Sequence, residues 1–348
     1  MSKVYSAAYL RDFLNAVQEK SGIRRDIREV MTDSLLHSEL RGISSHGVIR
    51  IEAYLKRVEA GVLDQNADPT VVRDEGATAL LDANGGFGQW ASYRATEIAI
   101  EKARQYGVGV VGVRNSNHYG EAAYYAEMAS QAGMIGINVS SCSPAIAPYG
   151  AAEAVFGTNP IAMAVPTRAE PVTLDMATSV IAKGKLRLAA LAGQEIPLGW
   201  ARDANGHPTT DPSAALAGTL EAVGGPKGCA LTAMVDVLSG QLTDSVRAGE
   251  VKNITDVSGP AGNGQFFIVL NVGAFLPEER FLDNMDDFRR KYKSLTPVAG
   301  EVMLPGEIEY RRQMDSLKNG LSLKEGTEQA LRRVGERYGV PFREEDAE

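Results

Sequence analysis

The chain has 348 residues, of which 44% are hydrophobic and 23% charged, and its formal net charge is −8. This size allows a large core or two packed lobes. An acidic chain has no cationic excess to neutralise phosphates, so neither nucleic-acid binding nor attachment to an acidic membrane surface is expected. No stretch of about 18 residues is continuously apolar, which argues against a membrane-spanning segment.

The two cysteines, Cys142 and Cys229, form neither a CxxC pair nor a cysteine–histidine metal spacing, so no metal site is expected. Residues 1–5 lack the apolar core of a signal peptide and lead directly into an amphipathic pattern. Both observations favour a cytoplasmic protein with reduced thiols.

Apolar residues recur at helical spacing in the first sixty positions. They predict helices over residues 6–20 and 24–41, and a third helix that Ser44 or Ser45 caps and that ends near Gly61. Two short strands within 70–84, a glycine-rich turn over 85–88 and a helix over 90–105 follow.

From residue 108 the pattern alternates between strands and helices. Strands are expected over 108–113, 134–139, 161–165, 172–174 and 266–272, and helices over 119–132, 178–191, 230–238, 278–293 and 307–337, with a loop-rich stretch over 193–228. The order predicts an α/β fold with a mixed α/β core over 76–277 and a helical outer part made from 1–75 and 278–348.

Residues 107–112 read GVGVVG and match the GxGxxG pattern of dinucleotide-binding domains. That pattern is meaningful only where it follows a strand and opens a helix. Here a helical pattern precedes the glycines and an apolar strand contains them. The stretch is therefore interpreted as the end of a helix followed by a strand.

The segment RGISSHGVIR, residues 41–50, contains one of only four histidines. Imidazole is suited to moving a proton near neutral pH. Arg50 adds a cation that can hold a carboxylate with two hydrogen bonds. On a helix His46, Arg50 and Tyr54 would lie on one flank, with Ser45 orienting the imidazole. A surface helix with scattered polar residues explains the same spacing.

A second histidine lies in NSNHYG, residues 115–120, between an expected strand and an expected helix. The field of a helix N-terminus disfavours a protonated imidazole, so His118 should stay neutral. The free N–H groups of residues 119–121 could receive an anionic group such as a cofactor phosphate. The alternative is that Asn117 caps the helix and His118 only packs.

Weaker signals follow along the chain. Asp175, at the end of an expected strand, could bind ribose hydroxyls, orient a catalytic group or cap a helix. The loop GGPKG, residues 224–228, could bring backbone and Lys227 close to a phosphate. His37 within a helix and His207 in a turn are interpreted as structural or solvated.

Several motifs together resemble the malate/L-lactate dehydrogenase family of the non-Rossmann type, which also contains ureidoglycolate and sulfolactate dehydrogenases and a cyclic-imine reductase. The resemblance covers nearly the whole chain. It is carried by RGISSHG (41–47), NHYG (117–120), FGTNP (156–160), LDMATS (174–179), GPKG (225–228) and VDVLSG (235–240).

This resemblance implies hydride transfer between NAD or NADP and a small 2-hydroxy or 2-keto acid. It also implies a mixed-sheet fold unlike the doubly wound dinucleotide domain, and a homodimer with sites near the subunit contact. In the matching positions, the expected catalytic residues are Ser45, His46 and His118. The expected substrate contacts are Arg50, Tyr54, Thr158, Lys183 and Gly184. The expected cofactor contacts are His118, Tyr119, Gly120, Cys142, Asp175, Met176, Ala177, Lys227, Gly228, Pro305, Gly306 and Glu307.

The favoured hypothesis is an oxidoreductase in which Arg50 pairs with the substrate carboxylate and His46 is the acid/base, with His118 as second candidate. An NADPH-dependent reductase of a cyclic imino acid would use the same groups. A non-catalytic carboxylate-binding relative is the third hypothesis. The sequence leaves open the substrate, the direction of the reaction and the choice between NAD and NADP.

Overall fold

The computed structural model describes residues 4–343. Residues 1–3 and 344–348, which the expected outer helical part includes, lie outside the described residues. The α-helices are α1 (Ala7–Lys20), α2 (Arg25–Leu40), α3 (Ile51–Glu59), α4 (Gly88–Tyr106), α5 (Ala122–Gln131), α6 (Lys183–Ala192), α7 (Pro212–Ala217), α8 (Pro226–Asp236), α9 (Glu278–Lys293), α10 (Glu307–Asn319) and α11 (Glu325–Tyr338). Short helical turns are η1 (Val48–Arg50), η2 (Val237–Gln241) and η3 (Val272–Ala274).

The strands are β1 (Thr70–Glu75), β2 (Thr78–Asp82), β3 (Val108–Ser116), β4 (Met134–Ser140), β5 (Ile161–Val165), β6 (Val172–Met176), β7 (Ala201–Arg202), β8 (Thr219–Leu220) and β9 (Asn263–Asn271). Seven of them form one sheet in the order β1-β2-β3-β9-β4-β5-β6. Only β2 and β3 are parallel neighbours, so the sheet is mixed, as the α/β prediction requires. β1 belongs to this sheet, although the expected boundary at residue 75 placed it in the outer part.

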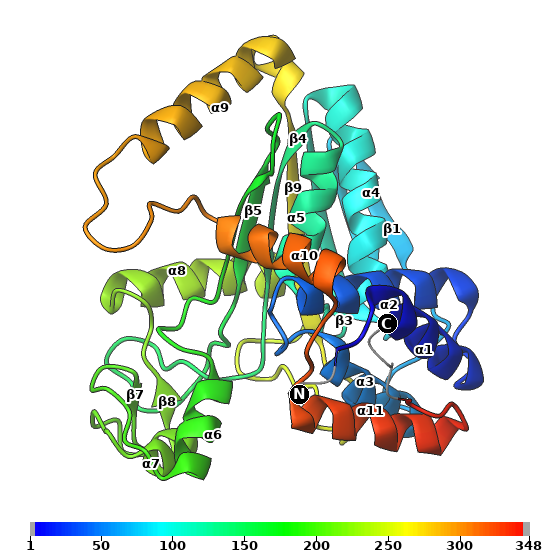
Figure 1. Cartoon of the computed structure of the whole chain (residues 1–348), viewed down its shortest axis with the longest axis vertical. Coiled ribbons are helices and arrows are strands. Elements are labelled where there is room, and N and C mark those ends of the chain that lie inside the picture. Colours follow the sequence, from blue (N-terminus) through cyan, green and yellow to red (C-terminus); the bar gives the residue numbers. More distant parts are fainter. Residues whose placement is uncertain (1–3, 344–348) are drawn as a thin grey trace.

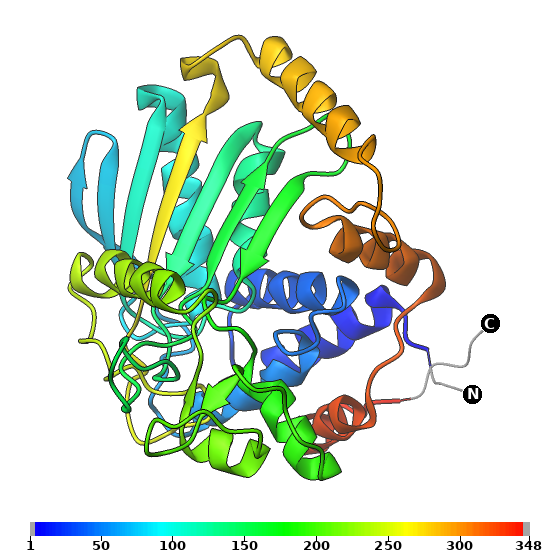
Figure 2. The same ribbon diagram turned by 90° about the vertical axis from the view of Figure 1, so that its left-hand side faces the viewer.

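The strand directions determine which connecting segments lie at the same end of the sheet. β3 and β4 both pair antiparallel with the central strand β9, and β6 is antiparallel to β5, which is antiparallel to β4. β3, β4 and β6 therefore run the same way and end at one edge of the sheet. The segments that follow Ser116, Ser140 and Met176 leave from this shared edge, which Figure 2 places at the lower end of the sheet.

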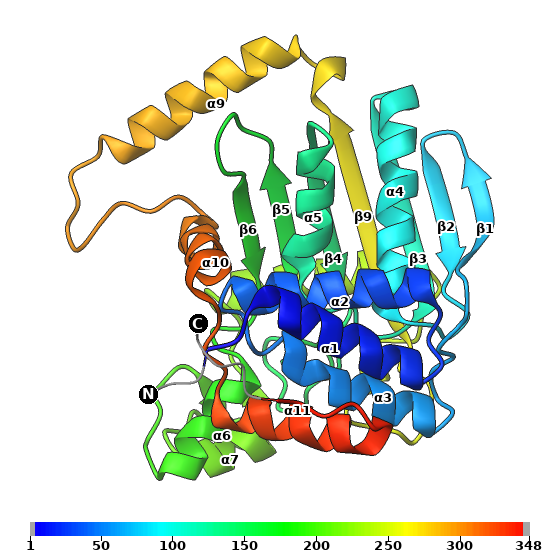
Figure 3. The same ribbon diagram turned by 45° about the vertical axis from the view of Figure 1, so that its right-hand side comes forward.

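Helices α4 and α5 cover one face of the sheet (Figure 3), through alanines such as Ala99 and Ala126. Small residues allow the close approach: a Cβ on Gly109 would lie 1.9 Å from the Ala99 carbonyl oxygen. Gly107 ends α4 in the left-handed conformation, with φ of 84°. The GxGxxG stretch is therefore a helix end followed by a strand, as predicted, and its glycines serve helix–sheet packing.

Helices α1, α2, α3 and α11 share a second core below the shared edge of the sheet (Figure 3). Segments from the two halves of the chain meet there, because Tyr5 and Leu321 exchange backbone hydrogen bonds of 2.8 Å. The expectation of a helical part built from both ends is confirmed for these helices. By contrast, α9 buries none of its residues and projects outward from the upper end of the sheet, the end opposite these helices (Figure 1).

Several element boundaries were wrong. The expected helix over 119–132 begins only at Ala122, because Gly120 has φ of 84° and cannot be part of a right-handed helix. The helix expected over 178–191 begins at Lys183. The single helix expected over 307–337 is divided into α10 and α11, since Gly320 leaves the helical conformation and Leu321 pairs with Tyr5.

The stretch over 193–228, expected to be loop-rich, contributes to a small separate core. Helices α6 and α7 and the two-stranded pairing of β7 with β8 pack there around Leu186, Ile196 and Leu220. The helix expected over 230–238 begins earlier, at Pro226, and is only partly buried, because Met234 is 57% exposed.

Candidate active site

His46 lies in a turn that precedes α3, so the prediction that His46, Arg50 and Tyr54 share one helix flank was wrong. The η1 turn begins at Val48, whose N–H donates to Glu39 Oε2 at 2.9 Å. The expected caps Ser44 and Ser45 do not perform this function. A Cβ on Gly47 would lie 2.0 Å from the same carboxylate oxygen, so the close approach of Glu39 requires glycine.

His118 follows β3 in an irregular loop rather than at the start of α5. Asn117 fixes this loop, because its Nδ2 donates to the carbonyls of Gly85 and Gly86, at 3.0 and 2.8 Å. Asn117 therefore holds the loop and does not cap α5. The N-cap of that helix is Glu121, without a side-chain cap of its own.

The two imidazoles meet although 72 positions separate them in the chain. The rings of His46 and His118 stack, with centroids 5.5 Å apart and an angle of 15° between their planes. Ser45 Oγ lies 3.0 Å from His46 Nδ1, and the Tyr54 hydroxyl lies 2.8 Å from His118 Nδ1. Tyr54 is 1% exposed, so the structure gives it a contact with His118 rather than an open position for substrate.

Both imidazoles are held neutral by their surroundings. Burial and the nearby Arg50 guanidinium lower the pKa of His46 to about 4, although Glu121 opposes this effect. Burial, His46 and Arg50 together place the pKa of His118 well below its ordinary value. Near neutral pH both rings are therefore uncharged, and an uncharged imidazole can accept a proton.

Arg50 is the fixed cation of this cluster. Its Nε donates to the Ser45 carbonyl at 2.5 Å. No carboxylate within residues 4–343 forms an ion pair with Arg50. A half-buried, unpaired guanidinium beside two neutral imidazoles is a place for the carboxylate of a ligand.

A cavity of about 520 Å³ opens beside Arg50. Its cationic lining is Arg50, Lys56, Arg187 and Lys324, and Glu52 is its only carboxylate. Glu52 already pairs with Lys56 and Arg333, so the cavity carries an uncompensated positive charge. Lys183, expected as a substrate contact, begins α6 near Arg187 and donates to the Pro144 carbonyl at 3.2 Å, while the adjacent Gly184 is exposed and faces open space.

Asp175 links β6 to α5. Its Oδ2 accepts the N–H of Ala123 at 2.8 Å, so it caps the helix that follows His118 rather than the next helix in the chain. Burial of the carboxyl and the nearby Glu121 raise the pKa of Asp175 to about 7, although the hydrogen bond from Ala123 opposes the rise. Met176 and Ala177, half-buried, continue along the shared edge of the sheet.

Cys142 and Thr158 are neighbours at the end of β4. Asn159 fixes this corner, because its Oδ1 accepts the N–H of Cys142 at 3.0 Å and its Nδ2 donates to the Thr232 carbonyl. Burial raises the pKa of the Cys142 thiol to about 11, although Thr158 opposes the rise, so the thiol stays protonated. Cys142 can line the site but is not a nucleophile there.

The start of α8 suits the pyrophosphate of a dinucleotide. Gly224 and Gly225 have positive φ angles, and a Cβ on either would meet open space, so their backbone is accessible. Lys227 is exposed and forms no ion pair within the described residues, and a helix N-terminus favours anions. Gly228 packs so closely that a Cβ would lie 1.8 Å from the Val223 carbonyl oxygen. These residues fit the anionic part of a nicotinamide cofactor.

Two of the expected cofactor contacts have side chains engaged elsewhere. Tyr119 is 3% exposed and its hydroxyl donates to Asn138 Oδ1 at 3.0 Å, so only its backbone is available. Glu307 is 3% exposed and pairs with Lys293 and Arg311.

The neighbouring Pro305 and Gly306 lie against β6, the outermost strand of the sheet. The Thr173 N–H donates to the Pro305 carbonyl at 3.0 Å. Gly306 has φ of 82°, and a Cβ there would lie 2.8 Å from the Thr173 carbonyl oxygen. The backbone of this pair therefore lies against the start of β6, where only glycine fits.

A buried ionic cluster behind His118 was missed by the sequence analysis. His37 Nδ1 and Nε2 each lie 3.0 Å from a carboxylate, of Glu121 and Glu127 respectively. Arg41 pairs with both carboxylates, at 3.4 and 2.7 Å. His37 is thus structural and not solvated. The spacing of His37 and Arg41 on one helix was visible in the sequence, but nothing in it paired them with α5.

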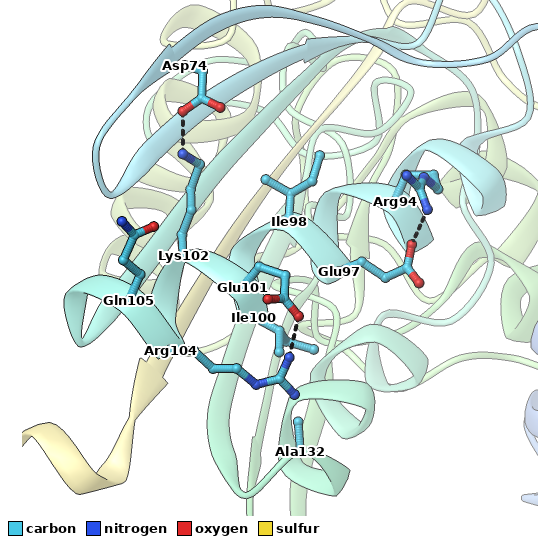
Figure 4. A pocket seen from close by; sticks show the side chains of 10 residues that line it. All are labelled: Asp74, Arg94, Glu97, Ile98, Ile100, Glu101, Lys102, Arg104, Gln105 and Ala132. Atoms are coloured by element: carbon cyan, nitrogen blue, oxygen red, sulfur yellow. Dashed lines mark hydrogen bonds and ion pairs between the residues drawn. The ribbon is translucent and has the colours of Figure 1, made fainter.

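A larger hollow, of about 830 Å³, lies on the outer side of α4 and is not this site (Figure 4). Its charged side chains already pair with each other, as Lys102 with Asp74 and Arg104 with Glu101. It contains none of the residues singled out above. Among residues 4–343, no helix is long and apolar enough to cross a membrane.

Comparison with known proteins identifies the family. The family model described as malate/L-lactate dehydrogenase matches residues 5–332. The chain is 38% identical to a malate dehydrogenase of Pyrococcus abyssi, over 95% of this chain and 94% of that protein. It is 34% identical to a Δ1-pyrroline-2-carboxylate/Δ1-piperideine-2-carboxylate reductase of Pseudomonas putida, over 93% and 95%.

The fold is shared as well. The solved structure of the sulfolactate dehydrogenase from Methanocaldococcus jannaschii superimposes with a TM-score of 0.92 at 34% identity, over 97% of this chain and 98% of that one. Names of further relatives specify NAD(+) as the cofactor. The chain belongs to the malate/L-lactate dehydrogenase family.

Proposed function

We propose that the chain is an NAD(P)-dependent oxidoreductase that interconverts a small 2-hydroxy acid and its 2-keto acid. The observation that carries the proposal is the stacked pair of neutral imidazoles, His46 and His118, beside the unpaired Arg50 guanidinium. A proton acceptor next to a carboxylate anchor is what oxidation of a 2-hydroxy acid requires.

In this proposal Arg50 holds the substrate carboxylate through a planar pair of hydrogen bonds. His46 takes the hydroxyl proton during oxidation and returns it during reduction, while Ser45 supports its Nδ1 at 3.0 Å. The bound nicotinamide supplies the hydride acceptor or donor. A carboxylate bound at Arg50 would compensate the cation that lowers the pKa of His46, which brings that pKa closer to neutrality in the complex.

The segments at the shared edge of the sheet would hold the cofactor. The accessible backbone at Gly224 and Gly225, with Lys227 at the start of α8, suits the pyrophosphate. Asp175 suits a ribose hydroxyl, and Cys142 and the backbone of 118–120 would line the remainder of the cofactor there. The backbone of 305–306 would contact the cofactor from the start of β6. Either NAD or NADP satisfies these contacts.

The cavity beside Arg50 supports a preference among substrates. Arg187 lines it and has no carboxylate partner within the described residues, so two free guanidiniums face one space. A hydroxy acid with a second anionic group, such as malate or sulfolactate, would occupy both. Lactate would leave Arg187 unpaired.

Two properties of the whole molecule extend the proposal. Helix α9 buries no residue and leaves Phe288 48% exposed, which supports a homodimer in which this helix contacts a second copy. Cys142 and Cys229 are both unpaired, which supports a cytoplasmic location.

A cyclic imino acid reductase is the second candidate, favoured by the Pseudomonas putida relative. Arg50 would hold the same carboxylate and His46 would protonate the nitrogen. One assay separates the candidates: turnover of malate, sulfolactate, lactate, ureidoglycolate and a cyclic imino acid, each with NAD(H) and NADP(H), followed by nicotinamide absorbance.

The role of His46 has its own test. His46→Ala should lower turnover of the preferred hydroxy acid by roughly 10²–10⁴-fold without unfolding the protein. A fully active variant would reject the acid/base assignment. Absence of turnover and of nicotinamide binding in the wild type would instead point to a non-catalytic carboxylate-binding protein.

A further inference from the structure

Arg57, in α3, is a buried cation that belongs to no ion pair among residues 4–343. Its side chain is 1% exposed. Burial lowers the pKa of its guanidinium, although the Asp256 carboxylate opposes this effect. A buried charge is costly unless hydrogen bonds replace the water that it loses. The hydrogen bonds of Arg57 therefore show which contacts compensate this cost.

These hydrogen bonds join α3 to two other segments. Nη1 donates to the Asp256 carbonyl, Nη2 donates to the Gly259 carbonyl at 3.0 Å, and Nε donates to Asn117 Oδ1 at 3.3 Å. Two of the acceptors are backbone atoms of the loop over residues 251–262, and the third belongs to the segment that follows β3. The planar fork of a guanidinium can reach three acceptors in different directions, which a single ammonium nitrogen cannot do.

The loop over 251–262 has a shape of its own. Its ends are joined by the Lys252 N–H, which donates to the Ala261 carbonyl at 2.9 Å. Within the loop, the Asp256 N–H donates to the Asn253 carbonyl at 2.8 Å. The loop therefore keeps its form as a unit, and its place in the molecule depends on the groups that hold it from outside.

This loop lines the cavity beside Arg50. Ile254, Thr255 and Val257 line the cavity from the loop, whereas Arg50 lines it from η1, the turn that leads directly into α3. Arg57 is part of α3 and donates to the loop, so one side chain joins the two sides of the cavity. It holds the loop at a set distance from the Arg50 guanidinium.

Arg57 holds the loop through backbone carbonyls, which are present whatever side chains the loop carries. The side chains that line the cavity can therefore change without loss of this attachment. Val257 is 45% exposed, so no core packing determines its identity. Ile254 is 8% exposed and packs in the same core as the residues of α3. Together they place apolar surface beside the cation that is free to hold a carboxylate.

We infer that the loop over 251–262 is a specificity-determining wall of the substrate cavity, and that Arg57 is the positioning residue that sets its distance from Arg50. The inference rests on the proposed function, in which Arg50 holds the substrate carboxylate. The part of the acid beyond its carbinol carbon then lies against Ile254 and Val257, which limit its size. Arg57 is buried and acts only through the loop.

Substitutions at Val257 test the wall with two hydroxy acids that differ by one methyl group, malate and 3-methylmalate. Val257→Ala should raise the ratio of kcat/KM for 3-methylmalate to that for malate by about tenfold, and Val257→Phe should lower it by about tenfold, as for small changes in an apolar pocket. Val237→Ala is the control, because Val237 is 44% exposed and does not line the cavity. A ratio that stays the same in both Val257 variants would refute the role of the loop.

Arg57→Lys tests the positioning role, since the charge is kept and the three-way attachment is lost. We expect kcat/KM for the preferred acid to fall by about 10²-fold, as for a misplaced binding surface, and mostly through KM. Arg337→Lys is the control, because Arg337 pairs with Glu59 of the same helix at 2.8 Å and is exposed. A fall in kcat with unchanged KM would contradict the inference.

Hydrogen exchange followed by mass spectrometry gives a result that does not depend on turnover. The peptide over 251–262 should exchange at least about tenfold faster in Arg57→Lys than in wild type, while peptides of α4 and α5 stay unchanged. Equal acceleration in all peptides would mean that Arg57 only stabilises the fold, and unchanged exchange in the loop would mean that Arg57 does not hold it. Either result would overturn the positioning role. Faster exchange of the loop alone, in a protein that turns over no acid, would instead support the attachment and reject the proposed function.

Discussion

The buried cluster of His37, Arg41, Glu121 and Glu127 makes stability depend on one imidazole. Burial alone would lower the pKa of His37, but its hydrogen bonds to the two carboxylates raise it to about 9. The same contacts lower the pKa values of Glu121 and Glu127 against the effect of burial. With His37 and Arg41 charged, two cations face two anions and the cluster is neutral.

Replacing His37 by Gln removes one cation and leaves Arg41 alone with both carboxylates. The rise from 6.5 to about 9 is roughly 2.5 pH units, which at about 1.4 kcal/mol per unit is worth up to about 3.5 kcal/mol of unfolding free energy, of which about 3 kcal/mol is present at pH 6. Breaking a buried ion pair by removing one partner costs a similar 3–5 kcal/mol in general. The two routes agree, so a loss of about 3 kcal/mol is expected.

The direction of the pKa shift determines how the contribution of His37 to stability changes with pH. Because the folded pKa of His37 is raised, its contribution is complete below about pH 6.5 and is lost as pH rises through about 9. Contributions of Glu121 and Glu127 have the opposite dependence and are lost only as pH falls through their lowered pKa values. The difference between wild type and His37→Gln should therefore be about 3 kcal/mol at pH 6 and below about 1 kcal/mol at pH 10.

Urea unfolding at fixed protein concentration, at half-unit steps from pH 6 to 10, measures this difference. Groups that titrate in both proteins cancel in the comparison. His207→Gln is the control, since the His207 side chain is 78% exposed and should show no such trend. A difference between wild type and His37→Gln that is constant over this range would refute the reasoning, because it would mean that His37 is not charged.

Three further outcomes are expected. Gly47→Ala should lower both Tm and kcat, because its Cβ would lie 2.0 Å from the Glu39 oxygen that caps η1; unchanged melting would contradict the fit. Arg50→Lys should mainly raise KM for every hydroxy acid, since an ammonium lacks the planar fork; steady-state kinetics decide. Arg187→Gln should lower kcat/KM for malate by about tenfold or more and leave kcat/KM for lactate unchanged. Equal effects on both substrates would contradict the proposed contact between Arg187 and a second anionic group. Lys185→Gln, on the same helix, is its control.

The predictable part of the fold is the part that local periodicity determines. The strands around 108–116 and 263–271 and helices such as α1, α2 and α9 were found because their apolar residues alternate or recur over several turns. Boundaries failed where one backbone angle decides them, as at Gly120, which delays α5, and Gly320, which separates α10 from α11. Glycine permits such backbone angles, but its presence in a sequence does not show whether the angle is adopted.

The residues of the candidate site can likewise be divided into those that the sequence predicts and those that it does not. His46, His118 and Arg50 could be singled out because their residue types and motifs point to chemistry, and the resemblance relates them. The contact of Tyr54 with His118 could not be predicted, because it joins α3 to a loop 64 positions later. Likewise, the Glu39 carboxylate replaced the serines expected as helix caps, and no local pattern distinguishes these partners.

The proposed acid/base residue His46 and the structural cluster are not independent, because Glu121 acts on both. Its carboxylate anchors α5 to α2 through His37 and Arg41, and it also raises the pKa of His46 against the effects of burial and of Arg50. Gly120, whose N–H donates to His118 Nδ1, is its immediate neighbour in the chain. Substitution of His37 should therefore lower the stability of the protein and also alter the geometry of the segment that holds His118. On this view the neutrality of the cluster matters as much as its contacts, because an unpaired Glu121 would raise the pKa of His46 further and alter the base on which the proposed reaction depends.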